Sequence, residues 1–111
     1  MTRATSAWLL LILAGLLEIG WPLGLKLSQA SDRRVMGLVA AAVCMAASGV
    51  LLWMAQREIP IGTAYAVWTG IGAAGTFLIG ISFFGDPISF VRVASAGLIV
   101  VGVIGLKLSH V

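Results

Sequence analysis

The sequence predicts an all-α integral membrane protein whose single domain, residues 1–111, consists of four transmembrane helices. The chain of 111 residues is 60% hydrophobic and only 10% charged. Its four apolar stretches are each about 20 residues long, which is enough to cross a bilayer. The polar segments between them are short, so consecutive helices are expected to lie side by side and antiparallel. The spans use most of the chain, which leaves no room for a soluble domain.

The four expected spans follow from the breaks in hydrophobicity. The first break is a polar loop at residues 28–34, the second is Gln56-Arg57-Glu58, and the third is Gly85-Asp86-Pro87. Asp86 is expected to cap the fourth helix, and Pro87 suits a first helical turn, where no amide donor is needed. The first apolar run is too long for a signal-peptide core and has no small-residue cleavage site after it, so we expect it to be retained. The spans cover about residues 7–27, 35–55, 60–84 and 88–106.

Composition and charge argue against several classes of function. The net charge of +3 is spread over loops and ends, so no nucleic-acid partner is expected. The lone Cys44 has no intrachain disulfide partner, and the single His110 stands near the C-terminus. No metal site, cofactor or nucleophile–base pair is expected, and the chain does not have the pattern of an enzyme.

Glu18 is the most informative residue, because it is the only acidic residue inside any of the four spans. It lies near the middle of the first span, where an ionised carboxylate costs several kcal/mol unless it faces a bundle interior, a water-filled path or a cation. Such a residue indicates function by default, and a carboxylate in this position is suited to carrying a proton. The alternative is a buried acid that is satisfied by hydrogen bonds alone.

The neighbours of Glu18 on its helical face suit a cation site. Gly15 is expected to leave space beside the carboxylate, and Trp21, one turn away, can offer its π face to a bound cation. Pro22 has no amide hydrogen, so the carbonyl of Glu18 loses its usual donor. Trp21 lies too deep to be a membrane-interface anchor, a role that Trp8 and Trp53 suit better.

The third span carries a polar and aromatic stripe at helical spacing. Its two rings and its hydroxyls share one face with small residues, and the tyrosine can donate a hydrogen bond to Glu18 or accept one from a substrate. The alternative is plain helix packing, with the tyrosine at the membrane interface. The stripe consists of Tyr65, Trp68, Thr69, Gly72 and Thr76.

The second and fourth spans contribute small polar residues at mid-depth. Ser48 can orient the carboxylate of Glu18 or bond its own helix backbone. Ser95 and Gly102 are small and seven residues apart, so they mark one face where another helix can pack closely. We expect that face to be an assembly surface.

The basic residues do not favour one orientation in the membrane. The side of the termini carries 3 basic residues (Arg3, Arg57, Lys107) and the opposite side carries 4 (Lys26, Arg33, Arg34, Arg92), which together are the 7 of the chain. Orientation normally follows an excess of Lys and Arg on the cytoplasmic side. A split of 3 against 4 predicts that the chain inserts both ways.

Three strings resemble the small multidrug resistance family of four-helix bacterial transporters, and within it the guanidinium exporter subtype. They are AGLLEIGWPLGLKLS, PIGTAYAVWTGIGA and GVIGLKLS. The resemblance implies an antiparallel homodimer in the bacterial inner membrane, with one shared site and proton-coupled alternating access. It assigns the central glutamate to Glu18, the site tryptophans to Trp21 and Trp68, the tyrosine to Tyr65 and a glutamate-orienting serine to Ser48. The longer N-terminus, Pro22 and Trp53 depart from the family pattern.

The deep carboxylate, its aromatic neighbours and the family resemblance together predict a proton-coupled exporter of guanidinium and small guanidinyl cations. Guanidinium is planar and always charged near neutral pH, and a carboxylate accepts two parallel N–H bonds from it. Protons and the cation compete for the same carboxylates. One alternative is a broader exporter of quaternary ammonium or other drug cations of the same family. Another is a membrane subunit that does not transport but assembles with or regulates a larger complex. The expected partners are the cation, protons, the lipid bilayer and a second, antiparallel copy of the chain.

Overall fold

A computed structural model describes residues 2–30 and 32–109, and four α-helices account for nearly all of them. They are α1 (Arg3–Ser28), α2 (Arg34–Ala55), α3 (Ile61–Phe83) and α4 (Phe90–Ser109). The shortest has 20 residues and spans about 30 Å at 1.5 Å per residue, so each helix is long and apolar enough to cross a membrane. The predicted all-α, four-span fold class is confirmed.

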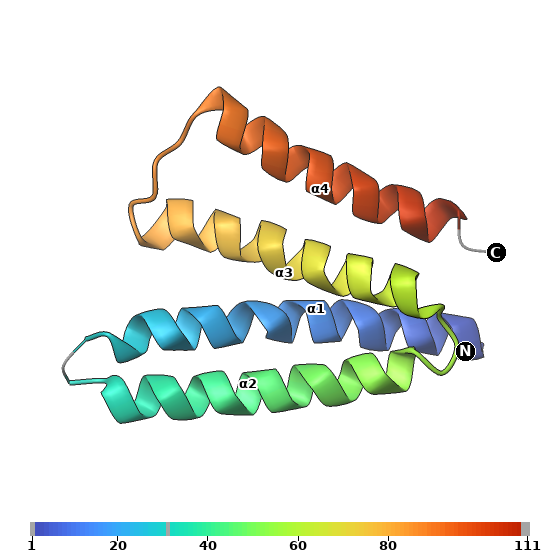
Figure 1. Ribbon diagram of the computed structural model, residues 1–111, viewed down its shortest axis with the longest axis horizontal. Coiled ribbons are helices and arrows are strands. Elements are labelled where there is room, and N and C mark those ends of the chain that lie inside the picture. Colours follow the sequence, from blue (N-terminus) through green and yellow to red (C-terminus); the bar gives the residue numbers. More distant parts are fainter. Residues whose placement is uncertain (1, 31, 110–111) are drawn as a thin grey trace.

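The helices form an up-and-down arrangement in which α1 lies between α2 and α3, and α4 packs on α3 (Figure 1). The start of α1 and the end of α4 lie at one end of the bundle, together with the α2–α3 connection. The α1–α2 and α3–α4 connections lie at the other end, which we call the loop end. This is the arrangement on which the count of basic residues per side depends.

Close contact between α1 and α2 depends on two glycines. A Cβ atom on Gly24 would lie 2.8 Å from the backbone nitrogen of Ala41, and one on Gly37 would lie 2.5 Å from the backbone nitrogen of Ser28. Neither position has room for a side chain, so the two backbones approach directly. This contact fixes the depth of α2, and therefore of Ser48, relative to α1.

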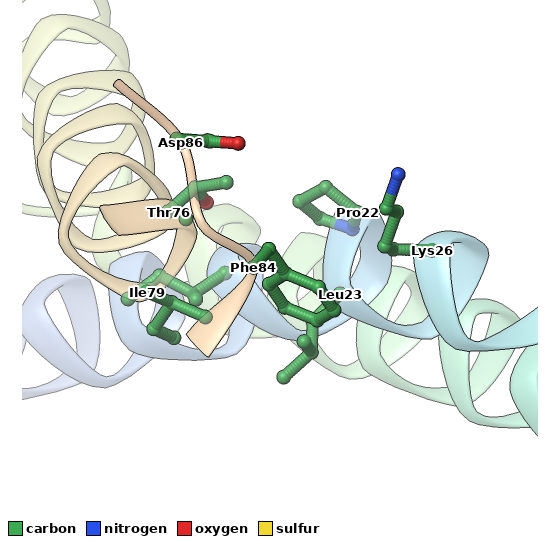
Figure 2. A pocket seen from close by; sticks show the side chains of 9 residues that line it. Pro22, Leu23, Lys26, Thr76, Ile79, Phe84 and Asp86 are labelled. Carbon is green, nitrogen blue, oxygen red and sulfur yellow. The ribbon is translucent and has the colours of Figure 1, made fainter. Parts of the chain in front are cut away.

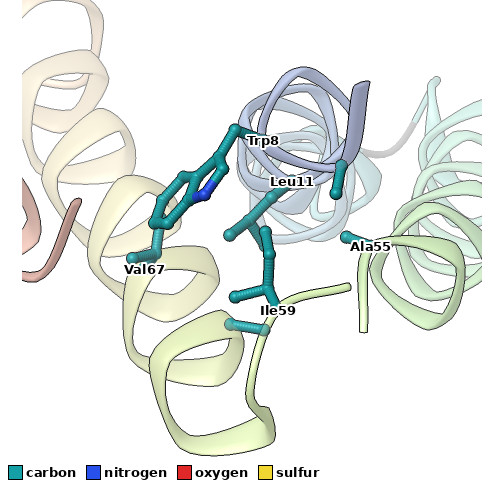
Figure 3. Packing of buried hydrophobic residues seen from close by; sticks show 7 residues of the cluster. Trp8, Leu11, Ala55, Ile59 and Val67 are labelled. Atoms are coloured by element: carbon teal, nitrogen blue, oxygen red, sulfur yellow. The ribbon is translucent and has the colours of Figure 1, made fainter. Parts of the chain in front are cut away.

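The main hydrophobic cluster lies near the end of the bundle that holds the N-terminus (Figure 3). Trp8 is only 6% exposed and packs with Leu11 and Val67 between α1 and α3. Its expected role as a membrane-interface anchor is therefore wrong for this chain. Trp53, by contrast, is 61% exposed, and the guanidinium of Arg57 lies 4.6 Å from its ring centroid.

The fourth helix begins later than the sequence suggests. Its first turn is capped by Ser89, whose hydroxyl oxygen accepts a hydrogen bond of 3.2 Å from the amide of Arg92. Asp86 does not cap it, because the chain from Phe84 to Ser89 is not helical and Asp86 folds back on α3. The expected cap at Asp86 is thus corrected to Ser89.

Candidate functional site

Glu18 lies half-buried on α1, and its carboxylate is held by Trp21 of the same helix. The indole Nε1–H of Trp21 donates a hydrogen bond of 2.7 Å to Oε1 of Glu18. A separation of three residues places the two side chains one above the other on a helix. The edge of the Trp21 ring that carries the N–H group therefore points at the carboxylate.

A cavity of about 380 Å³ opens beside this carboxylate between α1 and α3. Glu18 lines it from α1, and the hydroxyl-bearing Thr69 and Thr76 line it from α3. The Thr69 hydroxyl donates to the backbone carbonyl of Tyr65 at 2.8 Å, so its oxygen lone pairs can accept a hydrogen bond from a ligand. The other lining residues are Pro22, Gly72, Ala73, Phe77 and Asp86.

Space for the Glu18 side chain comes from Gly72 on α3. A Cβ atom at Gly72 would collide with the Cγ atom of Glu18. Gly15, expected to leave this space, instead faces Ile71, whose Cβ would lie 2.8 Å from an added methyl group. The close approach beside the acid is therefore made by α3, and Gly15 serves the packing of α3 on α1.

Ser48 joins α2 to both neighbouring helices. Its side chain is fully buried, its hydroxyl donates to the carbonyl of Ala14 on α1 at 2.6 Å, and the indole Nε1–H of Trp68 donates to it at 2.8 Å. The partner of the hydroxyl is thus neither Glu18 nor the backbone of α2. The Ala14 carbonyl that it bonds lies four residues before Glu18 on α1, so Ser48 fixes Trp68 rather than the carboxylate itself.

The polar stripe of α3 divides into two parts. Thr69, Gly72 and Thr76 line the cavity with Glu18, as their spacing predicts. Tyr65 and Trp68 lie further from the loop end, with ring centroids 5.5 Å apart and planes inclined at 51°. Tyr65 is 56% exposed.

The small residues of α4 lie on an open surface. No residue of α4 is buried, and a Cβ at Gly102 would meet nothing within 4 Å. The Ser95 hydroxyl donates to the carbonyl of Val91 at 2.6 Å within its own helix. Both residues are accessible for contact with another subunit.

Two features of the site were not anticipated from the sequence. They are Asp86, which lines the cavity from the α3–α4 connection, and Phe77, which lines it from α3. The signal for Asp86 was the preceding Gly85, a residue that commonly ends a helix by reversing the chain. Phe77 was missed because nothing in a single apolar residue distinguishes a cavity wall from a lipid-facing side chain.

Comparison with known proteins agrees with this architecture. Residues 6–99 match the family model described as Small Multidrug Resistance protein. The chain belongs to the small multidrug resistance family. A guanidinium exporter of Yersinia pseudotuberculosis is 50% identical over 103 residues, which are 93% of this chain and 98% of that protein. Guanidinium exporters of Citrobacter freundii and Escherichia coli K12 are 47% and 44% identical, each over 93% of this chain and 97% of their own length.

Family membership and the four apolar helices together give the location of this small multidrug resistance protein. It is a multi-pass protein of the bacterial inner membrane. Its relatives are named as exporters, which places the chain among transport proteins.

Proposed function

We propose that this small multidrug resistance protein is a proton-coupled exporter of guanidinium and small guanidinyl cations. The observation that carries the proposal is the carboxylate of Glu18, which lines a cavity of about 380 Å³ from the middle of a membrane-spanning helix. An acid at this depth needs a cation, a proton or a polar path. The names of the relatives support guanidinium as the cation.

The geometry around Glu18 suits a flat cation with several N–H donors. Each carboxylate oxygen accepts about two hydrogen bonds. Trp21 takes one position on Oε1, which leaves room for a bidentate pair of N–H bonds from guanidinium across Oε1 and Oε2. Thr69 and Thr76 line the same cavity, and their hydroxyl groups offer further acceptors.

Coupling follows from competition for the same carboxylate. Glu18 binds either a proton or the cation, so arrival of one releases the other. Exchange is obligatory if the empty, deprotonated protein does not switch its access from one side of the membrane to the other. Trp21, Ser48, Tyr65 and Trp68 are proposed to shape the cation site around Glu18.

The working unit is proposed to be an antiparallel homodimer. The balanced basic residues allow both orientations, and α4 offers an apolar face with no buried residue. Ser95 and Gly102 are proposed to lie in the contact between subunits. A two-fold axis in the membrane plane brings two Glu18 carboxylates into one shared cavity, where they titrate as a coupled pair.

Transport by the purified chain in liposomes tests this function. A guanidinium gradient should drive proton movement in the opposite direction, read from a pH-sensitive dye inside the vesicles. Quaternary ammonium ions at the same gradient should drive less proton movement. Equal responses would favour a broader cation exporter. No response to any cation would overturn the proposal and favour an assembly subunit that does not transport.

A further inference from the structure

Two cavities meet at the loop end of the site. The cavity that contains Glu18 shares Pro22, Thr76 and Asp86 with a second cavity of about 230 Å³, which continues toward the ends of α1 and α3. Figure 2 shows this second cavity, with Asp86 on one side of Pro22 and Lys26 on the other. A solute that moves between the loop end and Glu18 by this route passes Asp86.

The backbone holds Asp86 at this position. Gly85 has φ +70°, a left-handed conformation that reverses the chain after α3. The amide of Asp86 then donates to the carbonyl of Gly80 at 3.1 Å, and the Asp86 carboxylate lies against Gly80, where a Cβ atom would collide with it. The position of Asp86 therefore depends on two glycines for different reasons. Gly85 adopts a positive φ, and Gly80 has no side chain that would collide with the carboxylate.

Arg92 of α4 fixes the connection but makes no ion pair with Asp86. Arg92 donates from Nε to the carbonyl of Pro87 at 2.8 Å, and its guanidinium lies 5.2 Å from the ring centroid of Phe77. Asp86 has no ion pair within 4 Å among residues 2–30 and 32–109. The carboxylate therefore has no direct ion-pair partner in this part of the chain at the junction of the two cavities.

We propose that Asp86 is a second carboxylate on the cation path, which attracts the cation to the loop end of the cavity before it reaches Glu18. The inference rests on the proposed function, since it assumes that Glu18 binds the transported cation. A fixed negative charge beside a low-dielectric wall raises the local concentration of cations and their rate of entry. Lys26, of opposite charge, lines only the outer cavity, so the attraction directs the cation along the side of Asp86.

The test compares Asp86→Asn with Asp32→Asn in the full-length protein in liposomes. Both changes remove one carboxylate from the loop end and keep the shape of the side chain, but Asp32 lines neither cavity. At low ionic strength Asp86→Asn should raise the KM for guanidinium about threefold, the effect of one unit charge at roughly 7 Å in water, with an unchanged maximal rate. Added salt should reduce the difference, because it screens exposed charges.

A rescue separates electrostatic attraction from a structural role. Asp86→Glu should restore the low KM, and Gly80→Ala should raise it, because the added methyl group displaces the carboxylate. Equal KM values for Asp86→Asn and Asp32→Asn, or a rise in KM that salt does not change, would overturn the inference. Absence of guanidinium transport by the unmodified protein would instead overturn the proposed function, so the two failures are distinguishable.

Discussion

The indole N–H of Trp21 points at the carboxylate of Glu18 and bonds it at 2.7 Å. Both partners of the bond belong to α1 and are one helical turn apart. The bond holds one oxygen of the carboxylate, and the rest of the Glu18 carboxylate is available to the cavity that this residue lines. The orientation of Glu18 is thus set by its own helix, and α3 supplies the space through Gly72.

Glu18→Gln should abolish coupled transport and leave the protein folded. The amide keeps the size of the side chain and an oxygen that can accept from Trp21, but it can neither carry the proton nor attract the cation. Proton movement driven by guanidinium should fall to the level of empty liposomes. Glu58→Gln, at an exposed acid in the α2–α3 connection, is the matched control. Residual coupled flux in Glu18→Gln would remove Glu18 from the mechanism.

Trp21→Gly should weaken guanidinium binding and widen the range of cations accepted. Without the Trp21 hydrogen bond the Glu18 carboxylate is no longer held in its orientation, and we expect affinity to fall about tenfold, equivalent to about 1.4 kcal/mol. Loss of the ring also leaves space for bulkier ions. Binding isotherms over a series of guanidinium and quaternary ammonium ions measure both effects. Affinities that stay the same across the series would contradict this role.

Ser48→Ala should destabilise the fold more than it changes selectivity. The change removes the bond to the Ala14 carbonyl and leaves the N–H of the partly buried Trp68 without its acceptor, at a cost of about 1–3 kcal/mol. Unfolding in detergent measures the loss. Ser82→Ala, at an exposed serine of α3, should have little effect. Equal stability of the two variants would show that the Ser48 bonds contribute little.

Gly72→Ala should impair transport by displacing Glu18. The added methyl group collides with the Glu18 side chain, so either the carboxylate moves or α3 shifts away from α1. Gly49→Ala is the control, because a Cβ at Gly49 meets nothing within 4 Å. Guanidinium flux should fall at least tenfold in the first variant relative to the second, a change equivalent to about 1.4 kcal/mol. Normal flux from Gly72→Ala would mean that this contact does not constrain the site.

Two or three lysines added to the C-terminal tail should bias all copies toward one orientation. The natural split of 3 against 4 basic residues is close to balance, so a small excess decides the outcome. Activity should fall and should return on co-expression with an oppositely biased version. Cysteine labelling at the C-terminus reports the orientation directly. Labelling of the unmodified protein from one side only would refute dual insertion.

Hydropathy and spacing alone predicted the four membrane-spanning helices, the unusual position of Glu18 and the shared face of Thr69, Gly72 and Thr76. These properties are local. Helix length follows from the run of apolar residues, and a shared face follows from 3.6 residues per turn.

Only the tertiary structure decided which groups meet across helices. It buried Trp8, directed the Ser48 hydroxyl to Ala14, placed Gly72 against Glu18 and folded Asp86 back over the end of α3. Periodicity states which face a residue occupies but not which neighbour that face meets or at what depth. Those relations depend on close backbone contacts at glycines such as Gly24 and Gly37. They also depend on the chain reversal at Gly85, whose positive φ places Asp86 in the cavity wall instead of at the start of α4.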